Sequence, residues 1–413
     1  MKDIELMKRE YARMIVNQGI NLEKGQSLMI KTSLACYPFA SEVGQAAYEK
    51  GATHVEIRVD DLRLLNSRLS AQDDEKALSY IPPFFGNEDE VMIEEGWAYV
   101  RIDNTDERDV LKNADPDKLA LYSRANSLFH RKARIARMSN VVPWCVVCVP
   151  SDTWAKSILG EEAAEDDLWR VLAPILHLDQ EDPSRALAEH NQAIERRAGL
   201  LNSRHITSLH FRSSQTDVTV GLGPLHKWEG GGDFTVDGRP FYPNIPTEEV
   251  FTTPHFKKVD GIITTTKPVT LFDSRVNEMR FTFKDGKVVE ATASEGEDLL
   301  HKYLAIDEGS SFVGEIALVD QRSPIARADT VFNSILYDEN ASCHFALGAG
   351  YPTCLKLEHD KVNEQNLRDA GCNQSNVHTD FMFGSDDMSI VATDENGNEF
   401  VIMEDGKFTK DFE

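Results

Sequence analysis

The sequence predicts an α/β domain over residues 1–200, followed by a mixed α+β, largely antiparallel domain over residues 201–413. A chain of 413 residues with 41% hydrophobic content is large enough for two domains with separate cores. Helical and strand-like patterns alternate in the first half, which is typical of a parallel sheet with crossover helices. After residue 200, strand-like runs follow one another through tight turns, which is typical of antiparallel pairing.

The N-terminal elements follow in a regular order. Apolar residues at helical spacing from Ile4 to Ile15, behind Asp3, predict a first helix. Strands are predicted over 27–31 and 54–59, and the helix between them ends at Gly51. A strand–helix–strand unit implies a parallel pair with a right-handed connection. The same pattern continues along the chain, with a strand at 98–102, a helix at 120–138, a strand at 141–149, and helices at 168–178 and 185–201.

The C-terminal half is predicted to be rich in hairpins. Asp285-Gly286 and Asn396-Gly397 supply the positive φ angles that two-residue hairpin turns need. Each of these pairs lies between two strand-like runs. The predicted strands span residues 206–211, 217–222, 280–283, 288–292, 390–393 and 399–403.

Composition narrows the class of partner. Lys and Arg number 44 against 69 Asp and Glu, which gives a net charge of −25. This acidity argues against a nucleic acid or an anionic membrane surface as partner, and it suits a cationic ligand or a divalent metal. We expect no signal peptide and no membrane span, because no charge-poor apolar stretch reaches 18 residues. Six scattered cysteines in such a chain indicate reduced thiols and a cytoplasmic location.

Hard metal ligands concentrate in four stretches of the second half. Glu315 lies in the apolar run VGEIALV, where a carboxylate is costly to bury unless it is paired or bound to a metal. His378 and Asp380 are two residues apart, so on a strand they project from the same face. Each feature also has a simpler explanation, in which the side chain lies on a solvated face or at an exposed strand end.

Glu339 and His344 are harder to bring together. They are five residues apart, which on a regular helix is a rotation of about 140°. They can converge only if Glu339 lies at the first helical position or in the preceding loop. Combined, the four stretches supply three Glu, two His and one Asp without a thiol, a set that suits two divalent ions sharing a carboxylate and a bridging water. Zinc, cobalt, manganese and magnesium all remain compatible with this set.

Longer motifs carry a resemblance to a known family. NIPTEEVFTTP (244–254), GEIALV (314–319), YDENASCHFALGAGYP (337–352) and NVHTDFMFGS (376–385) occur in the order and spacing of the thermophilic-type metallo-aminopeptidases, aminopeptidases T and S. The segment YARMIVNQGINLEKGQSLMI (11–30) resembles the opening helix and strand of that family. The resemblance therefore covers essentially the whole chain.

The resemblance implies a function and a set of roles. It implies a metal-dependent aminopeptidase, a homodimer, that releases N-terminal residues from peptides with a free N-terminus. Tyr351 would steady the oxyanion, and either Glu248 or Glu315 would take the proton of the attacking water. The carried-over metal ligands of this C-terminal catalytic domain are Glu249, Glu315, Glu339, His344, His378 and Asp380.

An oxidoreductase is the alternative. His344, His378 and Asp380 alone would form the two-histidine, one-carboxylate triad of a mononuclear non-haem iron dioxygenase, as in the related dihydroxypyridine dioxygenases. A one-iron oxygenase has no use for three further inward carboxylates, whereas a two-ion hydrolase requires them. Glu249, Glu315 and Glu339 therefore favour hydrolysis.

Overall fold

The computed structural model describes residues 2–103, 108–111, 113–272, 274–358 and 361–413. The chain divides into two compact units. The first unit comprises Met1–Ala188 and Gly232–Pro246, and the second comprises Glu189–Gly231 and Thr247–Glu413. The position 200 expected as a boundary falls inside helix α10 (Pro183–Asn202). Among the described residues, no helix combines the length and the apolar character needed to cross a membrane.

The first unit is built on a five-stranded sheet in which every pair is parallel. The strand order is β2-β1-β3-β4-β9, which is the doubly wound order 2-1-3-4-5. The α/β prediction for this part of the chain is therefore confirmed. The strands are β1 (Leu28–Ser33), β2 (Val55–Asp60), β3 (Ala98–Asp103), β4 (Trp144–Cys148) and β9 (Asn244–Ile245).

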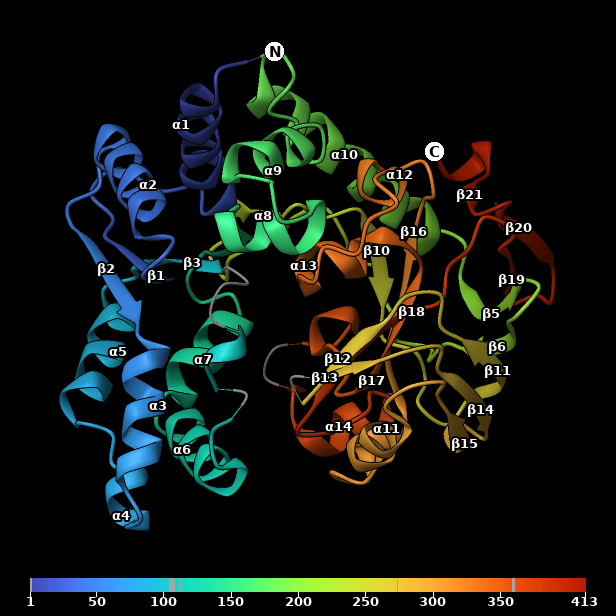
Figure 1. The fold of residues 1–413 in the computed structure, drawn as a ribbon. Coiled ribbons are helices and arrows are strands. Elements are labelled where there is room, and N and C mark those ends of the chain that lie inside the picture. The colour runs from blue at the N-terminus through green and yellow to red at the C-terminus, as the bar shows by residue number, and fades with distance from the viewer. Residues whose placement is uncertain (1, 104–107, 112, 273, 359–360) are drawn as a thin grey trace. The chain divides into compact units, whose positions relative to one another are not determined.

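Helices lie on both sides of this sheet. Figure 1 shows α1 (Ile4–Met14) and α2 (Tyr37–Lys50) on one side and α3, α5, α6 and α7 on the other. The carboxylate of Asp3 accepts from the backbone N–H of Leu6 and caps α1, and Gly51 ends α2 with a φ of 105°. The remaining helices of this unit are α3 (Leu62–Ala71), α4 (Glu75–Leu78), α5 (Phe84–Glu94), α6 (Pro116–Phe129), α7 (Arg131–Met138), α8 (Asp152–Leu159) and α9 (Glu165–Leu172).

The helix predicted over 120–138 is in fact two helices. His130 separates α6 from α7, with a ψ of 14° in place of the helical value near −42°. The amphipathic spacing continues across the break, and no proline or glycine marks it, so periodicity alone predicted one continuous helix.

The second unit contains two main antiparallel sheets and one further pair of short antiparallel strands. The smaller has the order β10-β16-β17-β18, and the larger has the order β15-β14-β11-β6-β5-β19-β20-β21. The six strands predicted from the sequence all lie in the larger sheet, and both Asp-Gly and Asn-Gly hairpins are present there. The strands of the smaller sheet are β10 (Glu249–Thr252), β16 (Val313–Val319), β17 (His344–Gly348) and β18 (His378–Met382). Those of the larger sheet are β5 (Ile206–Arg212), β6 (Asp217–Gly221), β11 (Val259–Thr264), β14 (Arg280–Lys284), β15 (Lys287–Thr292), β19 (Ser389–Asp394), β20 (Glu399–Glu404) and β21 (Lys407–Phe408).

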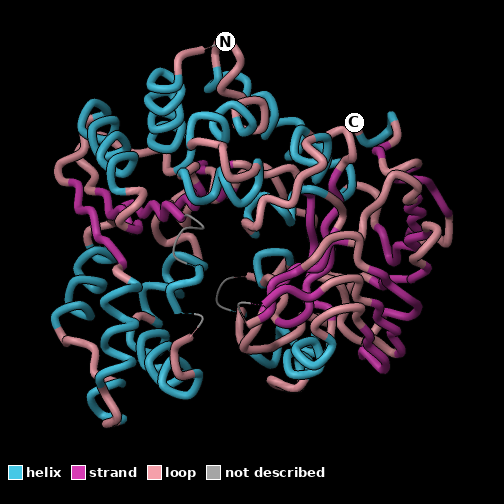
Figure 2. The backbone as a smooth tube through the Cα atoms, in the orientation of Figure 1, coloured by secondary structure: helices cyan, strands magenta, loops and turns pink. Residues whose placement is uncertain are grey.

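The two sheets enclose an aromatic core. The ring of Phe281 on β14 lies 5.5 Å from that of Phe345 on β17 and 5.3 Å from that of Phe381 on β18. Figure 2 shows the strands of this unit gathered together, with helices at their margins. One face of the smaller sheet is thus committed to the core, and its other face is available for chemistry. Short elements complete the unit: β12 (Val269–Leu271), β13 (Ser274–Val276), α11 (Glu297–Leu304), α12 (Pro324–Arg327), α13 (Ile335–Asp338) and α14 (Glu364–Asp369).

Candidate metal centre

Strand alternation places the predicted ligands on one face of the four-stranded sheet. Successive side chains of a strand leave on opposite faces. Ile316 of β16 and Phe345 of β17 enter the hydrophobic core, so their neighbours Glu315 and His344 face the other way. By the same rule Glu249 faces opposite to the buried Val250. A buried Glu in an apolar run is thereby explained, because the run has one core face and one ligand face.

Two alanines leave room among the ligands. In the strand register, Ala346 is opposite Glu315 on one side and Asp380 on the other. Ala317 is opposite Phe251 and His344. Side chains directly opposite in antiparallel strands lie about 4.5–5.5 Å apart at Cβ. A methyl group is the smallest side chain after glycine, so these two positions take up little of the room between the candidate ligands.

Gly314 fixes the backbone immediately before Glu315. A Cβ atom at this position would lie 2.4 Å from the carbonyl oxygens of Gly348 and Ala349. The register between β16 and β17 also shifts between Val313 and Glu315. Glycine is required here because the two strands approach so closely, and the shifted register aims Glu315 into the site.

Five of the six predicted metal ligands converge in two overlapping groups. Within each group the candidate ligand atoms lie within 4.8 Å of one another. Glu315 belongs to both groups. The first group is Glu249, Glu315 and His344, and the second is Glu315, His378 and Asp380.

Two buried oxygens in these groups lack hydrogen bonds. His344 Nε2 lies 3.0 Å from Glu249 Oε2, and His378 Nε2 lies 3.5 Å from Asp380 Oδ1. Neither oxygen has a hydrogen-bond partner among the described residues. Buried polar atoms are rarely left without a partner. Lone-pair donors that lie close together without hydrogen-bond alignment fit a shared cation, so the residues present suit a bound metal.

Backbone carbonyl groups orient both imidazoles. His378 Nδ1 donates to the carbonyl oxygen of Ala349 at 2.7 Å, and His344 Nδ1 lies 3.2 Å from that of Ser342. Because a carbonyl only accepts, Nδ1 keeps its proton and Nε2 faces the carboxylates, where its lone pair would be available to a metal. Metal-binding histidines are commonly oriented in this way.

Charge repulsion marks the cluster as a site for cations. Burial, together with the carboxylates of Asp380 and Glu249, raises the pKa of Glu315 to about 7 despite the opposing contact with His378. Burial opposes protonation of His344, but the carboxylates of Glu249, Asp380 and Glu315 outweigh it and raise its pKa to about 10. The carboxylates of Glu249, Glu315, Glu339 and Asp380 would carry a charge of −4 when ionised, which two divalent cations would balance.

Glu339 lies beside the two groups and outside both. It opens a 3-10 turn, Glu339–Ala341, that follows α13, and His344 begins β17. Burial and then the charges of Asp380 and Glu249 raise its pKa well above the ordinary value. No regular helix joins Glu339 to His344, which is the condition that their five-residue spacing required.

Tyr351 is held next to His378. Its hydroxyl oxygen lies 3.3 Å from His378 Nε2, and its ring lies edge-on to the rings of His378 and Phe251. Thr253 Oγ1 accepts from the backbone N–H of Tyr351 at 2.9 Å and donates to its carbonyl oxygen at 3.0 Å. Burial, reinforced by Glu315, raises the pKa of Tyr351 well above 10, so the phenol remains a hydrogen-bond donor.

Glu248 lies apart from the other predicted catalytic residues. Its carboxylate lies 3.5 Å from His190 on α10, and it is in neither ligand group. Burial raises its pKa to about 8, against the lowering charge of Arg197. Glu248 and Glu249 are therefore adjacent in sequence but lie in different environments. Glu249 lies among the candidate ligands, and Glu248 lies against α10.

Sequence reasoning missed the small residues and the threonine. Ala317, Ala346 and Gly314 carry no functional group, and Thr253 forms its hydrogen bonds with the backbone of Tyr351. The alternation within HFALG (344–348) contained a signal for Ala346, since a small residue there follows His344 by two. The role of Thr253 depends on a partner 98 residues away and has no local signal.

Comparisons with known proteins place the chain in a family. A family model described as thermophilic metalloprotease (M29) matches residues 5–408. Aminopeptidase 2 of Geobacillus stearothermophilus is 34% identical, over 97% of this chain and 97% of that protein. Aminopeptidase T of Thermus thermophilus is 33% identical, over 96% of this chain and 97% of that protein.

A solved structure extends the comparison to the fold. Wild-type AmpT from Thermus thermophilus matches with a TM-score of 0.90 and 31% identity, covering 98% of this chain and 100% of that one. The resemblance seen in the sequence motifs is thereby confirmed. The chain belongs to the thermophilic metalloprotease family M29.

Proposed function

We propose that this protein is an aminopeptidase that removes N-terminal residues from peptides with a free N-terminus, using a water molecule activated by two divalent cations. Membership of the M29 family makes it a metal-dependent peptidase. The relatives named above are aminopeptidases, which supports cleavage at the N-terminal end.

One observation carries the proposal of two cations. Glu315 belongs to both ligand groups, as expected of a carboxylate shared by two ions. Glu249 and His344 would hold one ion, and His378 and Asp380 would hold the other. Glu339, beside both groups, would be the sixth ligand. Oxygen and imidazole donors without a thiol suit zinc, cobalt, manganese or magnesium.

The cations, when bound, would lower the pKa of a shared water and polarise the scissile carbonyl. The chain then has to accept a proton and pass it to the leaving amine. Of the two predicted proton acceptors, Glu315 lies in the cluster and Glu248 faces His190. An ionised carboxylate has about four lone-pair sites, so Glu315 can contact cations and still accept a proton. We therefore assign proton transfer to Glu315.

Tyr351 would stabilise the charge that develops on the substrate oxygen. Its raised pKa keeps the hydroxyl protonated, and the clamp by Thr253 fixes its backbone. A donor that is already oriented needs no rearrangement as the negative charge develops. The carboxylates around it would also favour a substrate with a positively charged α-amino group.

The dioxygenase alternative has no comparable support. Its triad requires His344, His378 and Asp380 around one iron. Within the described residues, the two histidines fall into different ligand groups and share none. We therefore do not retain the oxidoreductase hypothesis.

The test combines activity with a metal count. The purified protein, reconstituted with each of the four metals, is assayed on aminoacyl p-nitroanilides and on the same compounds with an acetylated amino group. Cleavage of the free amines alone, with two metal ions per chain by elemental analysis, is the expected result. One ion per chain in a fully active protein would rule out the two-ion mechanism.

Single substitutions distinguish the loss of a metal ligand from the loss of a negative charge elsewhere in the protein. Loss of a partner that only orients a ligand already costs about 10–100-fold. We therefore expect Glu315→Gln and His378→Ala to lower kcat/KM by more than about 100-fold. Glu290→Gln on the exposed side of β15 removes the same charge and should retain activity. Full activity in Glu315→Gln or His378→Ala would overturn the site assignment.

Two further proposals concern assembly and location. We propose a homodimer, on the resemblance to the family, and sedimentation equilibrium would measure it. We propose a cytoplasmic location because six cysteines scattered through a chain of this size are typical of proteins that keep their thiols reduced.

A further inference from the structure

A large cavity in the first unit has no part in the metal centre. Its volume is about 1120 Å³, and all of its lining residues belong to the first unit. It lies on the face of the five-stranded sheet that α3, α5, α6 and α7 cover. A cavity of this size is at the upper end of the range of small-molecule sites.

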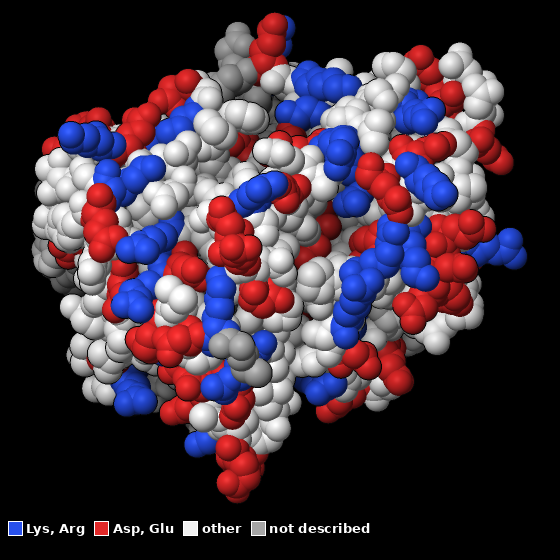
Figure 3. Space-filling view, turned by 90° about the horizontal axis from the view of Figure 1, so that it is seen from above, with Lys and Arg blue, Asp and Glu red and all other residues white. Residues whose placement is uncertain are grey.

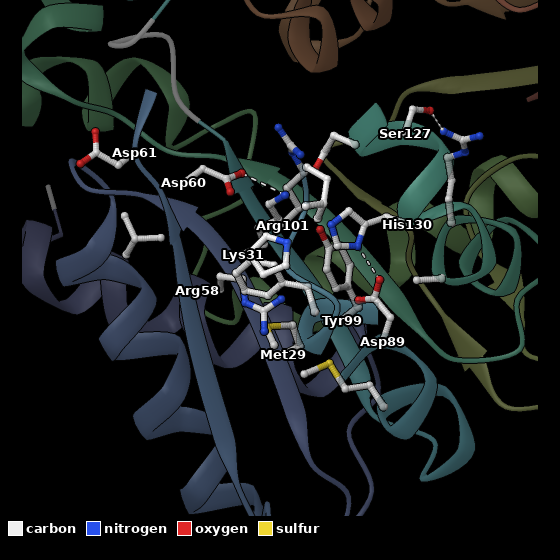
Figure 4. A pocket seen from close by; sticks show the side chains of 18 of the residues that line it. Met29, Lys31, Arg58, Asp60, Asp61, Asp89, Tyr99, Arg101, Ser127 and His130 are labelled. Carbon is white, nitrogen blue, oxygen red and sulfur yellow. Dashed lines mark hydrogen bonds and ion pairs between the residues drawn. The ribbon is translucent and has the colours of Figure 1, made fainter. Parts of the chain in front are cut away.

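Three cations cross the floor of this cavity in one row. In the register of the parallel strands, Lys31 of β1 is opposite Arg58 of β2 and Arg101 of β3. All three side chains line the cavity. Figure 4 shows them gathered together on the sheet. Like charges on adjacent strands are destabilising, and a carboxylate beside each of the three cations offsets part of that repulsion.

Helix α7 adds cationic groups above the same floor. Arg134 and Arg137 line the cavity together with His130, which precedes the helix. Spacings of four and three residues put these side chains on one helical face. Figure 4 shows His130 near the sheet cations, in contact with Asp89. The cavity therefore has basic groups on two separate elements.

Nearby carboxylates leave part of this charge uncompensated. Lys31 pairs with Asp60 at 3.0 Å, Arg58 with Glu88 at 2.5 Å, and Arg101 with Asp103 through Nε alone at 2.7 Å. Arg134 and Arg137 have no carboxylate partner within the described ranges. The lining holds six Lys and Arg side chains against three carboxylates, and Glu88 and Asp103 pair with two of the six from outside it, which leaves an excess of one positive charge. The lining cations are Lys31, Arg58, Arg68, Arg101, Arg134 and Arg137, and the lining carboxylates are Asp60, Asp61 and Asp89.

This local excess runs against the charge of the whole protein, which is −25. Figure 3 shows acidic and basic side chains interspersed over much of the face in view. A concave site lined by one sign of charge attracts the opposite charge strongly. A small anion that enters the cavity fits this pattern, and a nucleic-acid backbone does not.

Aromatic groups define the rest of the ligand. Phe85, Trp97, Tyr99 and Tyr122 line the cavity beside the cations. The guanidinium of Arg137 lies over the ring of Tyr99, 4.3 Å from its centre. Such surfaces bind flat, apolar bodies by stacking. The anion is thus expected to carry an aromatic group.

The topology of the five-stranded sheet places the cavity near the position where such sheets commonly bind ligands. Strand order reverses direction between β1 and β3 in the order 2-1-3-4-5. Open parallel sheets bind ligands at such switch points. Lys31 and Arg101 project from these two strands, two residues before their carboxyl ends, so the cation row lies on the face of the sheet next to the switch point.

We propose that this cavity binds a small organic phosphate with an aromatic body, the chemical class that includes nucleotides. Guanidinium groups match phosphate oxygens in paired hydrogen bonds. A phosphate group offers more negative charge than a single carboxylate, and it can compensate Arg134 and Arg137, which have no carboxylate partner within the described ranges.

The test measures binding to the full chain by calorimetry, without added divalent cations, using ADP, adenosine, inorganic phosphate and naphthoate. ADP should bind at least tenfold more tightly than adenosine, phosphate or naphthoate. Arg137→Gln and Lys31→Gln should each weaken ADP binding about 10–100-fold, the range expected for lost charge-assisted hydrogen bonds. Thermal unfolding of each variant verifies that it is folded.

Two controls make the result specific. Arg131→Gln removes one charge from the same helix at an exposed position outside the lining, and it should change ADP affinity by less than about twofold. Glu315→Gln should bind ADP like the wild type, which excludes capture of the phosphate at the metal centre. Absence of ADP binding, equal loss in Arg131→Gln and Arg137→Gln, or tighter binding of naphthoate than of ADP would overturn the proposal.

Discussion

Ala346→Val tests whether the floor of the ligand face is kept open for cations. Ala346 is fully buried and opposite both Glu315 and Asp380, so two added methyl groups would enter the space between these carboxylates. Overpacking of this kind costs about 1–3 kcal/mol. If the cost falls on the metal-bound state, metal affinity drops about 5–150-fold. The metal-free fold should tolerate the change, because valine favours strands.

Competition with a chromogenic chelator measures this affinity, and chromogenic substrates measure the activity that depends on it. Ala392→Val, fully buried in the eight-stranded sheet, adds the same two methyl groups away from the ligands and should leave affinity unchanged. Ala346→Gly should bind metal normally with a small loss of stability. Wild-type affinity and activity in Ala346→Val would show that this space is not where the cations bind.

Three further predictions follow from contacts in the same unit. Thr253→Val removes both hydrogen bonds to the backbone of Tyr351, so kcat should fall about tenfold while Thr253→Ser retains it, as steady-state kinetics would measure. In the protein stripped of metal by a chelator, the free energy of unfolding should fall as pH rises from about 5 to 9. In the folded state the pKa of Glu315 is about 7 and that of His344 about 10, above their ordinary values of 4.5 and 6.5. The folded state therefore binds more protons than the unfolded state over this range, and it loses that advantage as pH rises. Urea unfolding of the metal-free protein at several pH values would refute this if stability rose instead. Glu248→Gln should raise the unfolding free energy at pH 8 and leave it nearly unchanged at pH 4. Glu248 has a pKa of about 8 in the folded protein, whereas an unfolded glutamate ionises near 4.5. At pH 8 this difference destabilises the wild-type fold by roughly 1.4 kcal/mol per pKa unit, and glutamine removes that cost. The same variant should keep its metal and most of its activity, and loss of activity with retained metal would return proton transfer to Glu248.

The fold was predictable where local patterns decide it. The spacing behind Asp3, the stop at Gly51 and the turn at Asp285-Gly286 are each encoded within a few residues, and each is present in the structure. The break at His130 was not predictable, because the apolar spacing of two helices happens to continue across it. The pairing of β9 with β4 also lies beyond local patterns, since it joins segments about 100 residues apart.

The site was predictable in composition, and less so in arrangement. The His378–Asp380 spacing predicts a shared strand face, and the structure has it. Glu248 and Glu249 could not be told apart from the sequence, because strand alternation separates them only once the core side of β10 is known. The ligands' convergence depends on the order of four strands from residues 249 to 382, which no spacing along the chain encodes.

The division of β16 into a core face and a ligand face has a consequence for how substitutions act. Along residues 315–318, odd positions face the cluster of candidate ligands and even positions face the aromatic interior. A saturation screen that scores cellular abundance and turnover separately should record a rhythm of two residues. Changes at Glu315 and Ala317 would yield a folded protein without activity. Changes at Ile316 and Leu318 would lower the cellular abundance of the protein.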